Sequence, residues 1–137
     1  MKIKLSSIAL LAVIVPGEAG TATLTDAEAT FLDQLVTAAA VLEQRCTGYE
    51  ANGIGGVQLG ARLLGSNDAA MAMIAAFDTA IQANDGAGYD ASKFRPGVLE
   101  AVRKTFKRLQ ADLTKDRKRA CVDYGETSVE RGLLRRY

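Results

Sequence analysis

Apolar and polar residues alternate along the first part of the chain with the period of an α-helix. Between Leu24 and Cys46, apolar positions recur every three or four residues, and they form a stripe of Phe31, Leu35, Ala38, Leu42 and Cys46. Thr25 and Glu28 match the Thr-x-x-Glu capping box, in which each side chain bonds the backbone of the other residue. The pattern predicts a first helix over Leu24–Cys46, with Cys46 on its buried side and Gly48 as its stop.

A glycine-rich stretch follows, where the helical signal is weaker because each glycine costs about 1 kcal/mol relative to alanine inside a helix. Residues 51–65 still keep a helical spacing of apolar side chains. We therefore expect a short second helix at about Gly56–Leu64, closely packed through its glycine side. A third helix is expected at Asp68–Ala83, and its buried stripe should consist of Ala70, Met71, Ile74, Phe77 and Ile81.

The second half of the chain predicts a loop and two more helices. Turn residues mark the loop at residues 84–90, and Pro96 suits the first position of a fourth helix, Pro96–Cys121. The buried stripe of this helix should be Val98, Val102, Phe106, Leu109, Leu113 and Ala120. A second Thr-x-x-Glu pattern predicts a short fifth helix at Thr127–Arg136. No run of useful length alternates with the period of a strand.

The amino terminus has the pattern of a secretory signal peptide. Lys2 and Lys4 precede an apolar run at Ile8–Val15, and small residues then allow cleavage after Ala19 or Ala22. The run would reach only about 12 Å as a helix, too short for a membrane span. The sequence predicts a signal peptide at residues 1–22, a single helical domain at residues 23–137, and a periplasmic or secreted location.

The chain has two cysteines, Cys46 and Cys121. In an exported protein, two cysteines most often form one disulfide. Closing a loop of about 75 residues would stabilise the fold by up to roughly 4.5 kcal/mol in the chain-entropy model. The expected fold class is therefore all-α, a small bundle of four to five helices with one disulfide.

Charge is distributed unevenly between the two halves of the predicted mature chain. Thr23–Ala91 holds two basic and nine acidic residues, whereas Ser92–Tyr137 holds thirteen basic and six acidic residues. The two halves should pack together and neutralise each other. The alternative is a basic face for an anionic partner. Stacking on single-stranded nucleic acid is not expected, because Phe106 is the only aromatic residue among the cations of the fourth helix and belongs to its buried stripe.

Most catalytic chemistry has no candidate residues in this sequence. Histidine is absent, which removes the usual general base and the commonest metal ligand, so we expect no metal and no cofactor. The glycine-rich stretch lacks the Gly-Lys-Ser/Thr ending of a phosphate-binding loop. A pair of carboxylates acting as acid and base remains an alternative, although no spacing selects one. We expect a protein that is not an enzyme and has no catalytic residues.

The two cysteines share a local pattern, since Tyr49 and Tyr124 each follow a cysteine by three positions. By default these tyrosines should pack around the disulfide. The functional alternative is a binding surface beside the disulfide, and its candidate residues are Arg45, Tyr49, Tyr124, Arg135, Arg136 and Tyr137. No partner, ligand or oligomeric state can be named from these residues.

Together with the leader, the segments FLDQLVTAAAVLEQRC and CVDYGETSVERGLLRRY carry a resemblance to a family. The chain resembles small uncharacterised secreted two-cysteine helical proteins of alphaproteobacteria, which implies an all-α fold and an exported location but no activity. The ending is also similar to the Cys-x-x-x-Tyr and Arg-Lys-Tyr pattern of periplasmic immunity proteins against cell-wall amidase toxins. Here Tyr124 follows Cys121 by three positions instead of four, and the glycine-rich middle departs from that pattern.

We therefore expect an exported, non-catalytic helical protein that acts through protein or envelope contacts. A periplasmic immunity or inhibitor protein is the second hypothesis. A periplasmic enzyme that depends on carboxylates is the third.

Overall fold

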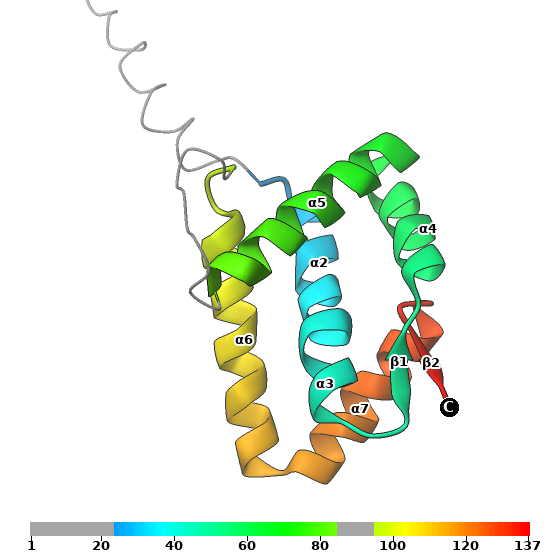
Figure 1. Ribbon diagram of the computed structural model, residues 1–137, viewed down its shortest axis with the longest axis vertical. Coiled ribbons are helices and arrows are strands. Elements are labelled where there is room, and N and C mark those ends of the chain that lie inside the picture. The colour runs from blue at the N-terminus through cyan, green and yellow to red at the C-terminus, as the bar shows by residue number, and fades with distance from the viewer. Residues whose placement is uncertain (1–23, 85–94) are drawn as a thin grey trace, which may run out of the picture.

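The computed structural model describes residues 24–84 and 95–137, and within them the fold is all-α with one small two-stranded ribbon (Figure 1). The helical elements are α2 (Asp26–Leu35), η1 (Val36–Leu42), α3 (Glu43–Arg45), α4 (Gly53–Leu64), α5 (Asn67–Asn84), α6 (Val98–Lys115) and α7 (Arg117–Glu130). The strands are β1 (Tyr49–Ala51) and β2 (Leu134–Arg136). The predicted signal peptide, residues 1–22, lies outside the described residues.

The first predicted helix is confirmed as one continuous helical run formed by α2, η1 and α3. Its capping box is present: the Thr25 backbone N–H donates to the Glu28 carboxylate at 2.9 Å, and the Glu28 N–H donates to the Thr25 hydroxyl at 3.1 Å. Cys46 follows the run in an extended conformation and ends it. The helix stands at the centre of the molecule, with α6 on one side and α4 on the other (Figure 1).

The middle of this helix is π-helical, which the sequence did not predict. In η1 the buried residues are Val36, Thr37, Ala38, Val41 and Leu42, which cover more of the helix circumference than one stripe. They are buried on several sides because η1 packs against α6, α7 and β1. The sequence shows a single apolar stripe along this helix, but the middle of the folded helix is buried on several sides.

Helices α4 and α5 form a hairpin that packs against α2. The second helix begins three residues before its predicted start, because the Asn52 side chain accepts from the Gly55 N–H at 3.1 Å and caps it. Its predicted packing through glycine is confirmed, since Gly55, Gly56 and Gly60 are buried while Ile54 is 74% exposed.

The third predicted helix is confirmed with nearly the predicted bounds, but part of its buried stripe was wrong. Met71 is 54% exposed, whereas Met73 is buried beside Phe77. The stripe is rotated toward Met73 because α5 must cover both α4 and α6. The loop predicted at residues 84–90 lies, beyond Asn84, outside the described residues.

The predicted helix Pro96–Cys121 is wrong, because two helices occupy this segment. Pro96 lies in a turn, and α6 begins at Val98. At Asp116 the backbone is extended (φ −156°, ψ 90°), and the Asp116 side chain accepts from the Arg119 N–H at 3.1 Å. Asp116 therefore caps the start of α7, and this change of direction allows α7 to pack against η1.

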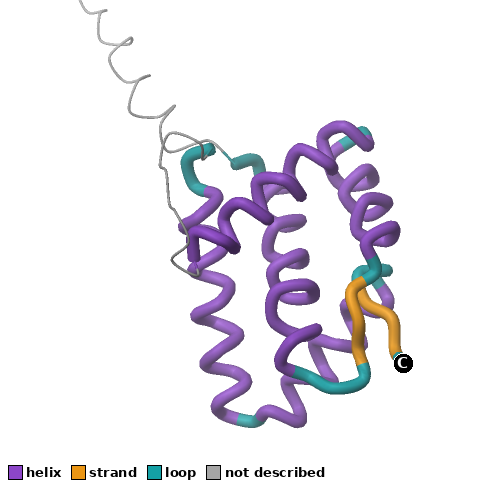
Figure 2. Tube along the Cα trace, in the orientation of Figure 1, coloured by secondary structure: helices purple, strands orange, loops and turns teal. Residues whose placement is uncertain are grey.

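The predicted helix Thr127–Arg136 is also wrong. The Thr127 hydroxyl donates to the Asp123 carbonyl at 3.0 Å within α7, so Thr127 does not cap a new helix. The chain turns at Gly132, whose φ of 83° favours glycine, and continues as β2. β2 pairs antiparallel with β1 in the register Tyr49↔Arg136, Glu50↔Arg135 and Ala51↔Leu134, and the two strands lie side by side in Figure 2.

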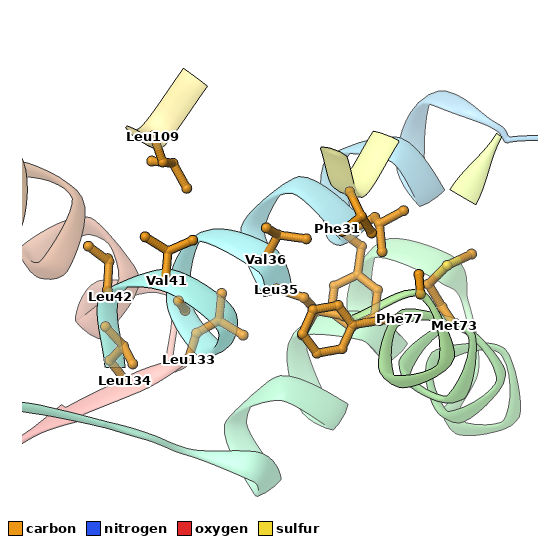
Figure 3. Packing of buried hydrophobic residues seen from close by; sticks show 14 of the residues in the cluster. Phe31, Leu35, Val36, Val41, Leu42, Met73, Phe77, Leu109, Leu133 and Leu134 are labelled. Carbon is orange, nitrogen blue, oxygen red and sulfur yellow. The ribbon is translucent and has the colours of Figure 1, made fainter. Parts of the chain in front are cut away.

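One hydrophobic cluster connects all of these elements except α3. Figure 3 shows Val41 of the central helix between Leu109 of α6 and the side chains of Leu133 and Leu134, and Phe31 of α2 on the side of Phe77 and Met73 of α5. The predicted disulfide is confirmed: Cys46 and Cys121 are bonded, with their Cα atoms 5.7 Å apart and a sequence separation of 75. It joins the end of the first helix to α7.

Candidate functional site

The ribbon gathers four of the six residues that the sequence suggested as a binding surface. Residues opposite each other in an antiparallel pair have side chains on the same face, and successive residues alternate between faces. Tyr49 and Arg136 therefore share the inner face of the ribbon, and Arg135 and Tyr137 share the outer face.

The inner face is fixed by one carboxylate of α7. The Tyr49 hydroxyl donates to Glu126 Oε2 at 2.8 Å, and the Arg136 guanidinium binds both oxygens of the same carboxylate. Burial and the bond to Glu126 raise the pKa of Tyr49, so the phenol stays protonated. The bond from Arg136, followed by the bond from Tyr49, lowers the pKa of Glu126. These bonds hold the ribbon against α7.

Tyr49 also packs directly on the backbone of α7. A Cβ atom placed on Gly125 would lie 2.4 Å from Cζ of the Tyr49 ring, which leaves no room for a side chain at that position. With 9% of its surface exposed, Tyr49 belongs to the hydrophobic cluster. The structure gives Tyr49 a packing role.

The outer face of the ribbon is open to solvent. Arg135 forms an ion pair with Glu50 directly across the ribbon at 2.8 Å, and the Tyr137 N–H donates to the Gly48 carbonyl at 3.1 Å. The backbone of Tyr137 is thus held in the ladder while its side chain is 78% exposed. Aromatic and arginine side chains are the types that most often dominate binding energy at protein interfaces.

Arg45 and Tyr124 lie away from this ribbon face. The Arg45 side chain donates to Gln110 of α6 at 2.9 Å, near the junction of α6 and α7. Tyr124 donates to Asp112 Oδ2 at 2.5 Å. Because residues two positions apart in an α-helix point to opposite sides, Tyr124 and Glu126 face away from each other across α7. The structure therefore does not bring Tyr49 and Tyr124 into one binding hollow.

Tyr124 instead lines a second feature, a surface hollow of about 350 Å³ that the sequence did not indicate. We refer to it as the polar hollow. Its lining comes from α2, η1, α6, α7 and the turn that follows, and consists of Asp33, Thr37, Arg108, Asp123, Tyr124, Thr127, Ser128 and Arg131. Every one of these side chains is polar.

Hydrogen bonds fix one wall of the polar hollow. Asp33 Oδ1 accepts from the Thr105 hydroxyl at 2.7 Å and from the Arg108 guanidinium at 2.9 Å. Burial is the largest single effect and would lower the pKa of Arg108, but the hydrogen bond and charge of Asp33, together with Tyr124, outweigh it and raise the pKa. The bond to Asp112, followed by burial, raises the pKa of Tyr124. Arg108 is thus a permanent cation and Tyr124 a neutral donor.

These residues escaped sequence analysis because three separated segments supply them. Asp33 lies on the polar side of the first helix, and Arg108 looks like one of many surface cations on α6. The only signal in the sequence was the pattern of polar residues along 123–131, and the predicted start of a helix at Thr127 obscured it. Their convergence depends on the break at Asp116.

Two further structural observations concern residues 24–84 and 95–137. Within these ranges no group of three histidine, cysteine or carboxylate side chains could hold a metal ion. None of the helices in the same ranges is long and apolar enough to cross a lipid bilayer.

Comparison with models of protein families, with curated proteins and with solved structures finds no match for this chain. The ribbon and the polar hollow are therefore the features from which a function can be inferred.

Proposed function

We propose that this chain is an exported helical protein without catalytic activity that acts by contact with another exported protein or an envelope component. The outer face of the ribbon makes that contact. The observation that carries the proposal is Tyr137, an aromatic side chain that is 78% exposed beside the exposed Arg135 while its backbone is held in a strand pair.

Export is supported by the leader-like residues 1–22 and by the disulfide, which is compatible with an oxidising compartment. The mass of the protein recovered from outside the cytoplasm tests this part. A chain that begins at Thr23 and takes up no alkylating reagent before reduction is expected. A full-length chain or two alkyl groups would contradict it.

Contact through the ribbon is supported by the way its outer face is held. The inner face is bonded to Glu126, and the disulfide connects the start of the β1 segment, through Cys46, to α7. A surface that is already ordered loses little conformational entropy when it binds. Tyr137 and Arg135 can therefore contribute most of their contact energy to a complex.

The test is affinity capture of a chain tagged at its amino-terminal end, from an extract of exported and envelope proteins. The binding variant carries Arg135→Ser and Tyr137→Ser, and the matched control carries Arg103→Ser, an exposed cation on α6 without an ion pair among the described residues. We expect a component retained in near-equal amount by the wild type and the control, and lost from the binding variant. Equal retention by all three chains would contradict the proposal.

The identity of the captured component separates the versions of this function. An immunity or inhibitor protein, which the ending of the chain resembles, should retain a cell-wall amidase and reduce its activity at an equimolar ratio. A structural or adaptor role predicts a partner whose activity does not change on binding.

A further inference from the structure

The polar hollow contains a hydroxyl group whose oxygen opens into the hollow and has no hydrogen-bond partner among the described residues. Ser128 is 2% exposed and lines the hollow, yet its hydroxyl makes no hydrogen bond to any residue in the described part of the chain. The neighbouring hydroxyls differ, because Thr37 and Thr127 donate to carbonyls four residues earlier, at 2.8 and 3.0 Å. Because this oxygen faces the hollow and bonds no atom of the described chain, a ligand atom in the hollow can bond it in place of water.

The backbone around the hollow is also unusual. Thr37 belongs to η1, the seven-residue π-helical segment, and Asp33 lies in the last turn of α2 just before it. Extended π-helical segments are rare, and shorter ones are frequently found at functional sites. The central helix therefore changes from α-helical to π-helical geometry beside the hollow, between Asp33 and Thr37.

The charges along α7 have a defined spacing. Asp123, Tyr124, Thr127, Ser128 and Arg131 recur at helical intervals and face the same hollow. Asp123 has only a loose ion pair with Arg119, at 3.9 Å, and Arg131 has no ion pair among the described residues. An available carboxylate and an available guanidinium thus lie at the two ends of the hollow with a free hydroxyl between them.

This spacing sets the size of a matching ligand. Asp123 and Arg131 are eight positions apart, which corresponds to about 12 Å along a helix axis. An extended peptide spans at most about 3.3–3.6 Å per residue, so two or three residues bridge this distance once the side chains lean inward. A single amino acid, whose charged groups are bonded to the same carbon, is too short.

We propose that the polar hollow binds a short peptide of two or three residues with free ends. The ammonium group lies at Asp123, the carboxylate lies at Arg131, and the Ser128 hydroxyl bonds the peptide backbone. This site is separate from the ribbon surface, and its test does not depend on the partner captured there.

The probe is trialanine, titrated into the oxidised, isotope-labelled chain while backbone amide resonances are recorded by NMR. We expect saturable shifts confined to amides of residues 123–131 and 33–37, and no saturation with free alanine. The amide-capped and the acetyl-capped peptides should each bind at least about tenfold more weakly, because each lacks one charged end. No saturable shift with trialanine up to about 10 mM would overturn the proposal.

Three variants assign the groups. Arg131→Gln should weaken the binding of trialanine, so that trialanine binds no more tightly than the amide-capped peptide. Asp123→Asn should likewise make trialanine bind no more tightly than the acetyl-capped peptide. Ser128→Ala should weaken binding without lowering stability, because the hydroxyl has no bond within the protein to lose. The matched control is Lys118→Gln, an exposed cation of α7 outside the hollow.

The two sources of such a peptide end give different results. A free peptide needs both of its charged ends to bind. If the natural ligand is instead the terminus of a partner chain, only one charged end matters, and one of the two capped peptides would bind as tightly as trialanine. That second result, or an unchanged preference for a free carboxylate in Arg131→Gln, would overturn the proposal.

Discussion

At the scale of single residues, Glu28 has two functions. Its carboxylate completes the capping box of α2, and it also binds Arg95 through both oxygens, at 2.6 and 2.7 Å. Arg95 immediately precedes the turn that leads into α6. One carboxylate therefore defines where the first helix begins and attaches the start of α6 to it.

The ion pair makes stability depend on pH in the acid range. The bond to Arg95 lowers the pKa of Glu28 below its ordinary value of 4.5, although burial opposes the shift. A lowered pKa in the folded state contributes stability that is complete above 4.5 and is lost as the pH falls further. We expect Glu28→Gln to lower the free energy of unfolding by about 0.5–1 kcal/mol near neutral pH, since Arg95 is partly exposed. Urea denaturation at several pH values measures this.

Glutamine at this position can still cap the helix, so the substitution changes mainly the charge. The difference between wild type and Glu28→Gln should shrink as the pH falls below 4.5. The matched control is Asp78→Asn, an exposed carboxylate of α5, which should keep the pH dependence of the wild type. A difference for Glu28→Gln that stays constant down to about pH 3 would contradict the ion-pair explanation.

At the scale of elements, the glycines of α4 act through close packing. A Cβ atom on Gly60 would lie 2.6 Å from the Phe31 ring and 2.7 Å from Cβ of Ala70, so α4 touches both α2 and α5 at this point. A Cβ atom on Gly55 would lie 1.7 Å from the Gly132 carbonyl oxygen. The glycine-rich segment is thus a helix whose backbone contacts three other parts of the fold.

Two substitutions in α4 should have opposite signs. Gly60→Ala should lower the free energy of unfolding by about 1–2 kcal/mol, because overpacking costs more than alanine gains in helix propensity. A Cβ atom on Gly53 meets nothing within 4 Å, so Gly53→Ala should raise the free energy of unfolding by up to about 1 kcal/mol. Urea denaturation of both variants gives the comparison. Equal signs would show that packing at Gly60 relaxes more easily than these distances indicate.

The sequence predicted elements where local signals decide the outcome and failed where distant contacts decide it. Thr25 and Glu28 are three residues apart, so the capping box was visible, and Cys46 and Cys121 had no other partner. The same Thr-x-x-Glu pattern at Thr127 gave a false helix start, because the preceding residues were already helical. The strand at Leu134–Arg136 exists only because β1 lies beside it.

The candidate surface was predicted in part for the same reason. Arg135 and Tyr137 are close in sequence and share the outer face of the ribbon. The sequence did not show that Tyr124 and Tyr49 lie at different places. The break at Asp116 decides which way each side of α7 faces, and this break was not predicted. The polar hollow depends on that same break and on η1, neither of which the pattern of apolar residues reveals.

At the scale of the whole molecule, the acidic first half and the basic second half are joined by ion pairs. Within residues 24–84 and 95–137, three connect the halves: Arg95 with Glu28, Arg108 with Asp33, and Arg135 with Glu50. They lie at the start of α6, along α6 and at the ribbon. The expected neutralisation is therefore present at three places, while cations such as Arg103 and Lys107 have no ion pair within the described residues.

The disulfide is the covalent counterpart of these contacts, and its removal tests how the halves are held together. Its loop of 75 residues predicts up to roughly 4.5 kcal/mol from the entropy of the unfolded chain, and native-state relaxation reduces this. We expect the variant with Cys46→Ala and Cys121→Ala to lose about 2–4 kcal/mol of unfolding free energy in urea. Its helical circular dichroism should not change before the transition, because the rest of the hydrophobic cluster remains.

The slope of unfolding free energy against urea separates an effect on the unfolded state from an effect on packing. Without the link the unfolded chain expands and exposes more surface, so the slope should increase. The control is the wild type in a reducing agent, which lacks the link but keeps both sulfur atoms. If only the link matters, its free energy of unfolding should match that of the double variant. If the reduced wild type is clearly more stable than the double variant, packing of the buried Cys46 side chain accounts for that difference, and only the difference between oxidised and reduced wild type measures the disulfide.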